Sequence, residues 1–304
     1  MALWEYYHLP ESVEAALTDL AQYDGKARIV AGGTDLLLEL QQGRRAPVAA
    51  LVDITQIPEL REIHLNDDVI TIGAAVTHTE IVASALLNQR ATCLVESCGV
   101  IGGPQVRNVA TLGGNVAHAL PAGDGTISLL ALDAQAEVAA AEGRKWHPIG
   151  DLFRGPGRSL VDQSRELLTR FRFRATDTNS RSAFKRIMRP QGVALPILGM
   201  AVWLEFDSDQ ETIADVRIGL GPAGPTPMRA ADAEAHLVGR KLRQEVLDEV
   251  SLRTLTEAKL RTSKHRATQA YRQELIGVLV QRNFGIVSQR IHQTEVVPEG
   301  IGLA

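Results

Sequence analysis

Two pairs of adjacent glycines are the residues whose type and spacing point most clearly to chemistry. The first pair, Gly32 and Gly33, follows the apolar segment 27–31 and precedes Thr34 and Asp35, which open a predicted helix. Glycine lets the backbone approach a ligand closely and adopt positive φ. Unpaired amide groups and the positive end of a helix then attract negative charge. We therefore expect this turn to bind an anionic group.

The second pair, Gly113 and Gly114, has similar surroundings, because it follows a segment with strand character and precedes the polar Asn115. A single glycine pair between two elements is usually a tight turn without a ligand. Two such pairs, with Asp124 and the segment 105–108 nearby, favour an extended ligand. That ligand would have more than one polar section, as a dinucleotide has.

A third glycine motif is a counter-example. Segment 219–224 reads Gly-Leu-Gly-Pro-Ala-Gly, which matches the G-x-G-x-x-G fingerprint of nicotinamide dinucleotide sites. That fingerprint requires a strand before it and a helix after it. Pro222, Pro225 and Pro227 occupy the place where the helix would begin. We expect a structural turn here, which disfavours a Rossmann-type dehydrogenase.

The sequence lacks the common catalytic and metal-binding motifs. It has no Gly-Lys-Ser/Thr phosphate loop, no His-Glu-x-x-His zinc motif and no Gly-x-Ser-x-Gly nucleophile elbow. We expect His78 and His118 to be cap or turn residues. Cys93 and Cys98 are too few for a four-thiolate cluster. We therefore expect no catalytic and no metal-binding residue, so that any electron chemistry belongs to a bound cofactor.

Length and composition are those of an ordinary folded protein. The chain has 304 residues, which predicts two or three domains. A net charge of −4 and an aromatic content of 4% argue against binding to nucleic acid or to a membrane surface. Residues 1–5 lack a signal-peptide start, and the apolar run 193–206 is too short to span a bilayer. Together with the low cysteine count, this predicts a cytoplasmic protein.

The elements that must position the glycine pairs form a β–α–β-type unit, about residues 1–55, and a larger segment, 56–176. Ser12 is a predicted helix cap in the first, and Thr77 with Glu80 has the spacing of a capping box in the second. The expected helices are 12–23, 34–40, 81–87, 92–98 and 126–132, and the expected strands are 27–31, 48–52, 61–65, 69–73, 135–141 and 167–173.

Beyond residue 176 the pattern changes to strands followed by helices, which is typical of an α+β domain. We expect antiparallel strands over 182–187, 197–206 and 212–220, and helices over 243–260 and 269–289. These elements predict a domain over residues 177–290. The remaining residues, 291–304, show no periodicity and are expected to form a tail.

These motifs resemble the FAD-binding medium subunit of the molybdenum hydroxylases. That family includes xanthine dehydrogenases, bacterial carbon monoxide dehydrogenases and aldehyde oxidoreductases. The resemblance covers nearly the whole chain. Its most specific part is the two glycine segments with the segments beside them. The segments that carry it are Ala31–Leu36, Gln105–Asn108, Thr111–Asn115 and Pro121–Asp124, then Ser182–Lys185, Pro225–Arg229, Tyr271, Arg272, Leu279 and Arg282.

The resemblance implies an α+β fold. A two-subdomain FAD-binding domain of the vanillyl-alcohol-oxidase type would occupy residues 1–176, and a smaller domain with an antiparallel sheet and helices would follow. FAD would be the cofactor of this chain. The partners would be a small subunit with two [2Fe-2S] clusters and a large molybdopterin subunit, in a dimer of heterotrimers. Electrons would pass from the clusters through FAD to NAD, oxygen or another acceptor.

The resemblance also assigns cofactor contacts. The first glycine segment would surround the pyrophosphate, and the second would bind the phosphate and ribityl region. Ile101 would pack on the flavin, Asp124 would accept a hydrogen bond from a sugar or ribityl hydroxyl, and Leu168 and Lys185 would contact FAD at the domain junction. The full set is Val30, Ala31, Gly32, Gly33, Thr34, Asp35, Leu36, Leu37, Ile101, Thr111, Gly113, Gly114, Asn115, Asp124, Leu168 and Lys185.

Two departures and two alternatives accompany this interpretation. Leu120 stands where many members have serine, and the segment 189–193 lacks the acidic residue often found there.

A free-standing flavin oxidase or reductase of the same fold would need an acid or base beside a substrate pocket, for which the sequence offers no convincing candidate. A non-enzymatic assembly subunit would not need its glycine pairs intact. The sequence indicates neither the organic substrate nor the final electron acceptor.

Overall fold

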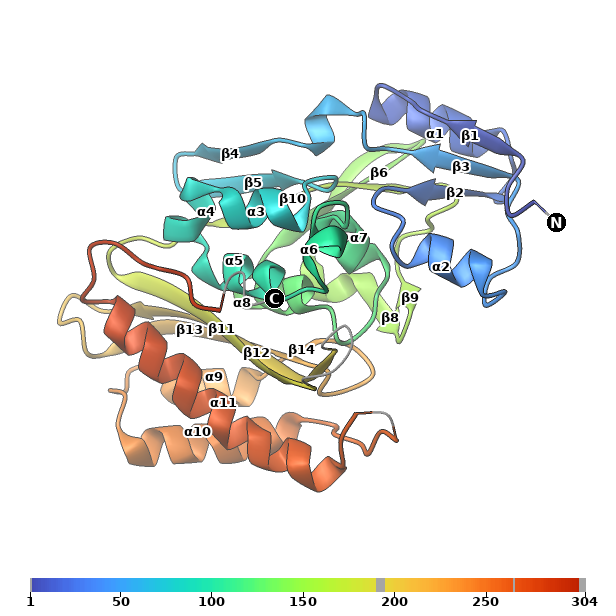
Figure 1. The fold of residues 1–304 in the computed structure, drawn as a ribbon. Coiled ribbons are helices and arrows are strands. Elements are labelled where there is room, and N and C mark those ends of the chain that lie inside the picture. The colour runs from blue at the N-terminus through green and yellow to red at the C-terminus, as the bar shows by residue number, and fades with distance from the viewer. Residues whose placement is uncertain (1, 190–194, 265, 301–304) are drawn as a thin grey trace.

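The computed structural model describes residues 2–189, 195–264 and 266–300. Figure 1 shows sheets with helices packed between and beside them. The N-terminal sheet is parallel, with the strand order β1-β3-β2. Its unit consists of β1 (Tyr6–His8), α1 (Val13–Ala21), β2 (Ala27–Val30), α2 (Leu36–Gln41) and β3 (Ala50–Asp53). The Ser12 side chain caps α1 by accepting a hydrogen bond from the Ala15 amide at 3.1 Å, which confirms that prediction.

The second sheet is antiparallel, with the order β4-β5-β10-β6-β7. Its strands are β4 (Ile63–Asn66), β5 (Val69–Gly73), β6 (Gln135–Ala140), β7 (Gly143–Pro148) and β10 (Leu167–Arg174). Between β5 and β6 the chain forms α3 (His78–Ala83), α4 (Ala85–Arg90), α5 (Thr92–Gly99), α6 (Pro104–Arg107), α7 (Leu112–Ala117) and α8 (Asp124–Ala131). Short connections are η1 (Pro58–Leu60), η2 (Ile149–Leu152), β8 (Phe153–Gly155) and β9 (Arg158–Ser159).

The third sheet is antiparallel as well, with its strands in sequence order. The strands are β11 (Ser180–Met188), β12 (Pro196–Phe206), β13 (Ile213–Gly221) and β14 (Met228–Arg229). Three helices follow, α9 (Ala231–Leu237), α10 (Gln244–Glu257) and α11 (Gln269–Arg290). They lie on the side of this sheet away from the rest of the chain (Figure 1). Among the described helices, none has both the length and the apolar character needed to cross a bilayer.

The third sheet is buried on both faces. Trp203 of β12 belongs to the same apolar core as Leu94 of α5 and Phe171 of β10, so α5 and its neighbours lie between the second and third sheets. The adjacent Val202 points the other way, into a core that it shares with Phe284 of α11. Successive side chains of a strand alternate between faces, so β12 contributes to both cores. The two parts of the chain are therefore joined through shared apolar packing.

The structure changes several predicted elements. The helix expected over 34–40 begins at Leu36, and the one expected over 81–87 is divided at Ser84 into α3 and α4. Gly113 and Gly114 lie inside α7, whereas a strand-to-helix turn was expected. By contrast, the motif that begins at Gly219 ends β13 and leads through a turn into β14. The prediction of a structural turn there is confirmed.

The C-terminal segment, which was expected to form a tail, is packed against the helices where the structure describes it. The backbone of Val296 exchanges two hydrogen bonds, both 3.0 Å long, with the side chain of Gln89 in α4. The Glu299 amide donates to the carboxylate of Glu96 in α5 at 2.8 Å. These contacts tie the end of the chain back to the helices of the N-terminal half.

Candidate functional site

The two glycine segments meet in space. A Cβ on Gly32 would lie 2.1 Å from the carbonyl oxygen of Val109 and 2.8 Å from Cα of Ala110. The loop after β2 is therefore in backbone contact with the residues that precede α7, an approach that only glycine permits. At the other end of α7, Nε2 of His118 lies 3.9 Å from Oδ1 of Asp35. The structure thus brings the two motifs into one site from about eighty residues apart in sequence.

The first glycine segment has amide groups available for a ligand. Gly33 has a φ of +66°, in the left-handed region that favours glycine. Its carbonyl accepts the Leu37 amide at 2.9 Å, which starts α2. Within the described part of the chain, the amides of Gly32, Gly33 and Thr34 donate to no protein acceptor. Three successive unpaired amides at a helix start form a cradle for an anion.

The second glycine segment uses its amides internally. The Gly113 amide donates to the carbonyl of Ala74 at 2.9 Å, and the Gly114 amide donates to Oγ1 of Thr111 at 3.0 Å. A Cβ on Gly113 would lie 2.6 Å from the same Ala74 oxygen, so this glycine is required for close packing against the strand end. The expectation of free amides therefore holds for the first segment and is wrong for Gly113 and Gly114. Thr111 keeps its hydroxyl hydrogen for a ligand.

Asn115 connects this segment to the next helix. Its Oδ1 accepts hydrogen bonds from both the amide and the hydroxyl of Thr126 in α8, each at 3.2 Å. Because the oxygen is occupied, the side-chain amide nitrogen is the group of Asn115 that remains for a ligand. Its role in the structure is thus to fix α7 against α8.

Asp124 begins α8 and is buried. Its Oδ2 lies 2.5 Å from Nη1 of Arg186 in β11, and both side chains are about 5% exposed or less. Within the described residues, Oδ1 of Asp124 and Nε of Arg186 have no hydrogen-bond partner. Burial raises the pKa of Asp124 to about 6, although the neighbouring guanidinium opposes this rise. The sequence interpretation identified Asp124 and missed Arg186, because an arginine on a strand carries no local sign of its partner.

The remaining expected contacts lie apart from this pair. Ile101 follows α5 and is half-buried. Leu168 is buried in β10, where it belongs to the core beneath the helices. Lys185 points to the opposite face of β11 from Arg186, and its Nζ lies 2.8 Å from Oε2 of Glu299. At this end of β11, it is therefore Arg186 and not Lys185 that faces Asp124.

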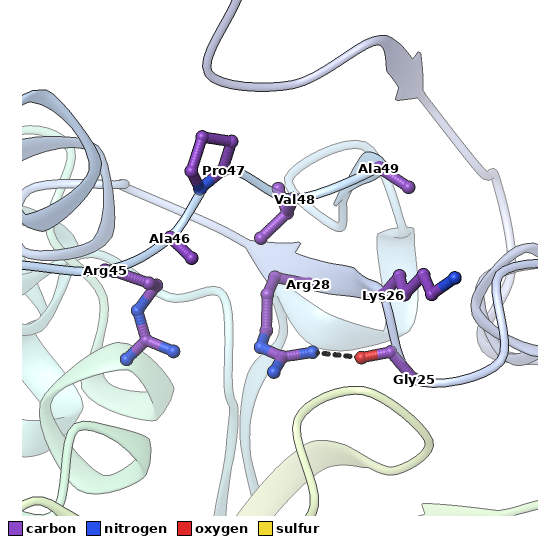
Figure 2. Close-up of a pocket in the computed structure, with 8 residues that line it drawn as sticks. All are labelled: Gly25, Lys26, Arg28, Arg45, Ala46, Pro47, Val48 and Ala49. Atoms are coloured by element: carbon purple, nitrogen blue, oxygen red, sulfur yellow. Dashed lines mark hydrogen bonds between the residues drawn. The ribbon is translucent and has the colours of Figure 1, made fainter. Parts of the chain in front are cut away.

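A basic cavity lies at the other end of β2 (Figure 2). Its volume is roughly 290 Å³, and its lining includes Lys26, Arg28 and Arg45. Nη1 of Arg28 donates to the Gly25 carbonyl at 2.7 Å, while Arg45 pairs with Glu39 at 3.0 Å. This basic cavity lies at the start of β2, whereas the glycine cradle lies at the end of the same strand. The basic cavity is therefore separate from the candidate site. Among the described residues, no three His, Cys, Asp or Glu side chains gather into a metal-binding group.

Comparison with known proteins matches both halves of the chain to family models. Residues 3–173 match the model described as the FAD binding domain in molybdopterin dehydrogenase. Residues 182–287 match the CO dehydrogenase flavoprotein C-terminal domain. The two models together cover almost all of the chain.

Curated relatives and solved structures agree with these matches. The chain is 29% identical to the xanthine dehydrogenase FAD-binding subunit of Escherichia coli O157:H7, over 91% of this chain and 93% of that protein. It is 30% identical to the nicotinate dehydrogenase FAD-subunit of Eubacterium barkeri, over 91% and 94%. A carbon monoxide dehydrogenase structure from Hydrogenophaga pseudoflava superposes with a TM-score of 0.88 at 28% identity, over 94% of this chain and 97% of that chain.

Proposed function

The chain belongs to the family of FAD-binding domains of molybdopterin dehydrogenases, and we propose on this basis that it is the electron-transferring FAD subunit of a molybdenum hydroxylase. Bound FAD would supply the redox chemistry, because it accepts and releases electrons and the protein side chains do not. The work of this chain's own residues is then to bind FAD, orient it and exclude water around it.

One observation carries the proposal: the cradle of amides at Gly32, Gly33 and Thr34, which donate to no acceptor in the part of the chain that the structure describes. A pyrophosphate needs hydrogen-bond donors and positive partial charge, and these amides supply both. Thr111 adds a hydroxyl on the neighbouring segment, which Gly32 holds in contact. At the domain junction, Asp124 has one carboxylate oxygen with no partner among the described residues, which suits a hydroxyl of the FAD chain. The residues present therefore fit FAD.

We extend the proposal to partners and electron flow. A small subunit with [2Fe-2S] clusters and a large molybdopterin subunit would complete the complex, and the organic substrate would be oxidised in the large subunit. Electrons would pass through the clusters to FAD in this chain and leave to NAD, oxygen or another acceptor. The relatives named as subunits and the carbon monoxide dehydrogenase structure support this arrangement. A dimer of such heterotrimers is the assembly that we propose.

Flavin content tests the proposal. We expect the purified chain, alone or with its partners, to hold about one FAD per chain, measured by absorbance after release of the flavin. Gly33→Val is expected to abolish binding, because it places a β-branched side chain at a positive φ in the cradle. Gly114→Val is expected to do the same, because its Cβ would lie 3.1 Å from Thr111 Oγ1 and displace that hydroxyl.

Three results would contradict the proposal. Full flavin retention by both glycine variants would show that FAD binds elsewhere or not through this cradle. Turnover of an organic substrate by the isolated chain would favour a free-standing flavoenzyme. Copurification with partner subunits but without flavin would favour an assembly subunit that has lost its cofactor.

A further inference from the structure

The ion pair between Asp124 and Arg186 joins two elements that are distant in sequence. Asp124 is the first residue of α8, and Arg186 lies in β11 of the third sheet. Their closest atoms are 2.5 Å apart, and the two side chains are 4% and 5% exposed. A buried pair of this kind is weak evidence for stability, because desolvation offsets much of the attraction. The ion pair lies between the FAD-binding region and the C-terminal sheet, so a role in the cofactor site would explain its presence better than stability does.

Both partners have an unused hydrogen-bonding atom. Asp124 Oδ1 and Arg186 Nε are enclosed and without a partner, and they are two of only seven such side-chain atoms in the described part of the chain. An unmade hydrogen bond on a buried charged group is costly, so native proteins usually fill such positions with a protein group, water or a ligand. The unused carboxylate oxygen is an acceptor and therefore suits a hydroxyl donor.

Arg186 is itself held beside other expected cofactor contacts. Its Nη2 donates to the carbonyl of Val100, the residue that precedes Ile101 at the end of α5. Arg186 therefore has two fixed partners on the FAD-binding side, one charged and one neutral. This arrangement fixes the direction of the guanidinium and, through it, the orientation of the Asp124 carboxylate.

Two charged groups and one neutral titratable group face Asp124. Arg186 of β11 is the nearest charge, Arg266 lies in the segment between α10 and α11, and Cys98 of α5 is a neighbouring buried thiol. Burial raises the pKa of the Asp124 carboxyl to about 6, and the two arginines oppose that rise. Without Arg186, a carboxyl in this position would be protonated at higher pH and would act less well as an acceptor.

We propose that Arg186 is a positioning residue of the flavin site, which fixes the Asp124 carboxylate across the domain junction with Oδ1 free to accept a hydrogen bond from FAD. This inference rests on the proposed function. Lys185, the basic residue that the family resemblance selects, points away and is paired with Glu299.

The pH profile of FAD affinity tests this inference on the whole chain. FAD would be titrated into the flavin-free protein between about pH 5 and about pH 9, with binding followed by quenching of flavin fluorescence. For the wild type, we expect affinity to fall only below about pH 6, where Asp124 takes up a proton. For Arg186→Gln, we expect the fall to begin about one pH unit higher, so that binding near pH 6 is about fivefold weaker than in the wild type.

Three further variants make the result specific. Arg186→Lys keeps a positive charge and is expected to retain the wild-type profile. Asp124→Asn cannot titrate and is expected to bind FAD more weakly, with no fall near pH 6. Arg174→Gln is the matched control, because Arg174 is an exposed arginine at the end of β10 whose carboxylate partner, Glu205, lies in β12 of the third sheet. We expect it to retain the wild-type profile.

The outcomes separate this inference from the proposed function. A wild-type pH profile in Arg186→Gln overturns the inference even if that variant is less stable, because a purely structural arginine changes stability and not the profile. If Arg186→Gln does not fold, a wild-type profile in Asp124→Asn overturns the inference in the same way. If the wild type itself binds no FAD at any pH, the proposed function fails, and this inference fails with it.

Discussion

At the scale of single residues, Gly32 is the point at which the site is assembled. A Cβ at this position would lie 2.1 Å from the Val109 oxygen and 2.6 Å from the carbonyl carbon of the same residue. Backbone atoms cannot rotate away as the end of a flexible side chain can, so the two segments would have to separate. The absence of one side chain therefore brings the amide cradle and Thr111 together.

We predict that Gly32→Ala lowers the free energy of unfolding by about 1–3 kcal/mol, the usual cost of forcing extra atoms into a packed contact. It is also expected to weaken FAD binding by at least about tenfold, since 1.4 kcal/mol corresponds to that factor. Urea denaturation and flavin titration measure the two effects. The control is Gly285→Ala in α11, where a Cβ meets nothing within 4 Å. Because alanine favours helix, the control should gain about 0.5–1 kcal/mol. Equal stability of the two variants would refute this account of Gly32.

His78 is a second residue whose environment sets a measurable property. It is 1% exposed at the start of α3, and burial, helped by nearby Arg107, lowers its pKa to about 4. The unfolded chain takes up a proton near the ordinary pKa of about 6.5, while the folded chain does not. Stability from this group is therefore complete above about pH 6.5 and is lost as the pH falls towards about 4.

We predict that His78→Gln reduces the loss of stability between about pH 7 and about pH 5 by about 2 kcal/mol relative to the wild type. Comparison of the two proteins is essential, because Asp124 acts in the opposite sense. Its raised pKa, about 6, means that the folded chain takes up that proton first and gains stability as the pH falls. Urea denaturation at both pH values gives the result. An unchanged pH dependence in His78→Gln would show that this histidine is not buried in its neutral form.

At the scale of elements, the capping box at Thr77 has a second role. Oγ1 of Thr77 accepts the Glu80 amide at 3.2 Å, and Oε2 of Glu80 accepts the Thr77 amide at 2.8 Å. The same residue forms an isolated antiparallel bridge with Thr111. Thr77 therefore fixes the start of α3 and also holds Thr111, the residue that caps α7, beside the cradle. Local sequence predicts the box, but only the tertiary fold adds the bridge.

For this element we predict that Thr77→Ala costs about 1 kcal/mol of stability, the typical cost of removing a helix cap. Thr77→Ser keeps the hydroxyl and is expected to retain most of that stability. Thermal or urea unfolding of the three proteins measures the difference. If Thr77→Ala were as stable as the wild type, or Thr77→Ser as unstable as the alanine variant, the cap would not be the source of the effect.

At the scale of the whole molecule, a buried ion pair joins four parts of the chain. The Arg290 guanidinium at the end of α11 lies 2.5 Å from Oε1 of Glu96 in α5, and both residues are buried. Glu96 also accepts the amides of Phe184 in β11 and Glu299 in the C-terminal segment, each at 2.8 Å. One carboxylate therefore gathers the helical layer, the third sheet, the last helix and the chain end.

We predict that Arg290→Met destabilises the protein by about 3–5 kcal/mol, because it leaves the Glu96 charge buried without its cation. Adding Glu96→Gln removes that charge while keeping an acceptor for the two amides. The double variant is therefore expected to be more stable than Arg290→Met alone, by denaturation under identical conditions. A double variant whose loss equals the sum of the two single losses would indicate that the residues do not interact.

Sequence alone predicted those features that depend on neighbouring residues. The Ser12 cap, the Thr77 box, the strands β4 and β5 and the turn after Gly219 follow from propensity and spacing within a few residues, and each is confirmed. The boundary at Ser84 was not foreseen, since its side chain caps α4 while α3 ends beside it. A residue that ends one short helix and begins the next does not change the spacing of the apolar residues, so hydrophobic periodicity does not reveal the boundary.

The sequence by itself thus determined the α+β class, the family and the two glycine pairs, because these are recorded in residue type and short-range order. The tertiary structure decided how those residues are used. It occupied the amides of Gly113 and Gly114 within the protein, gave those of Gly32 and Gly33 no acceptor among the described residues, and placed Arg186 opposite Asp124. These outcomes depend on contacts between segments far apart in the chain, and hydrogen-bond satisfaction across such contacts is fixed only when the segments pack.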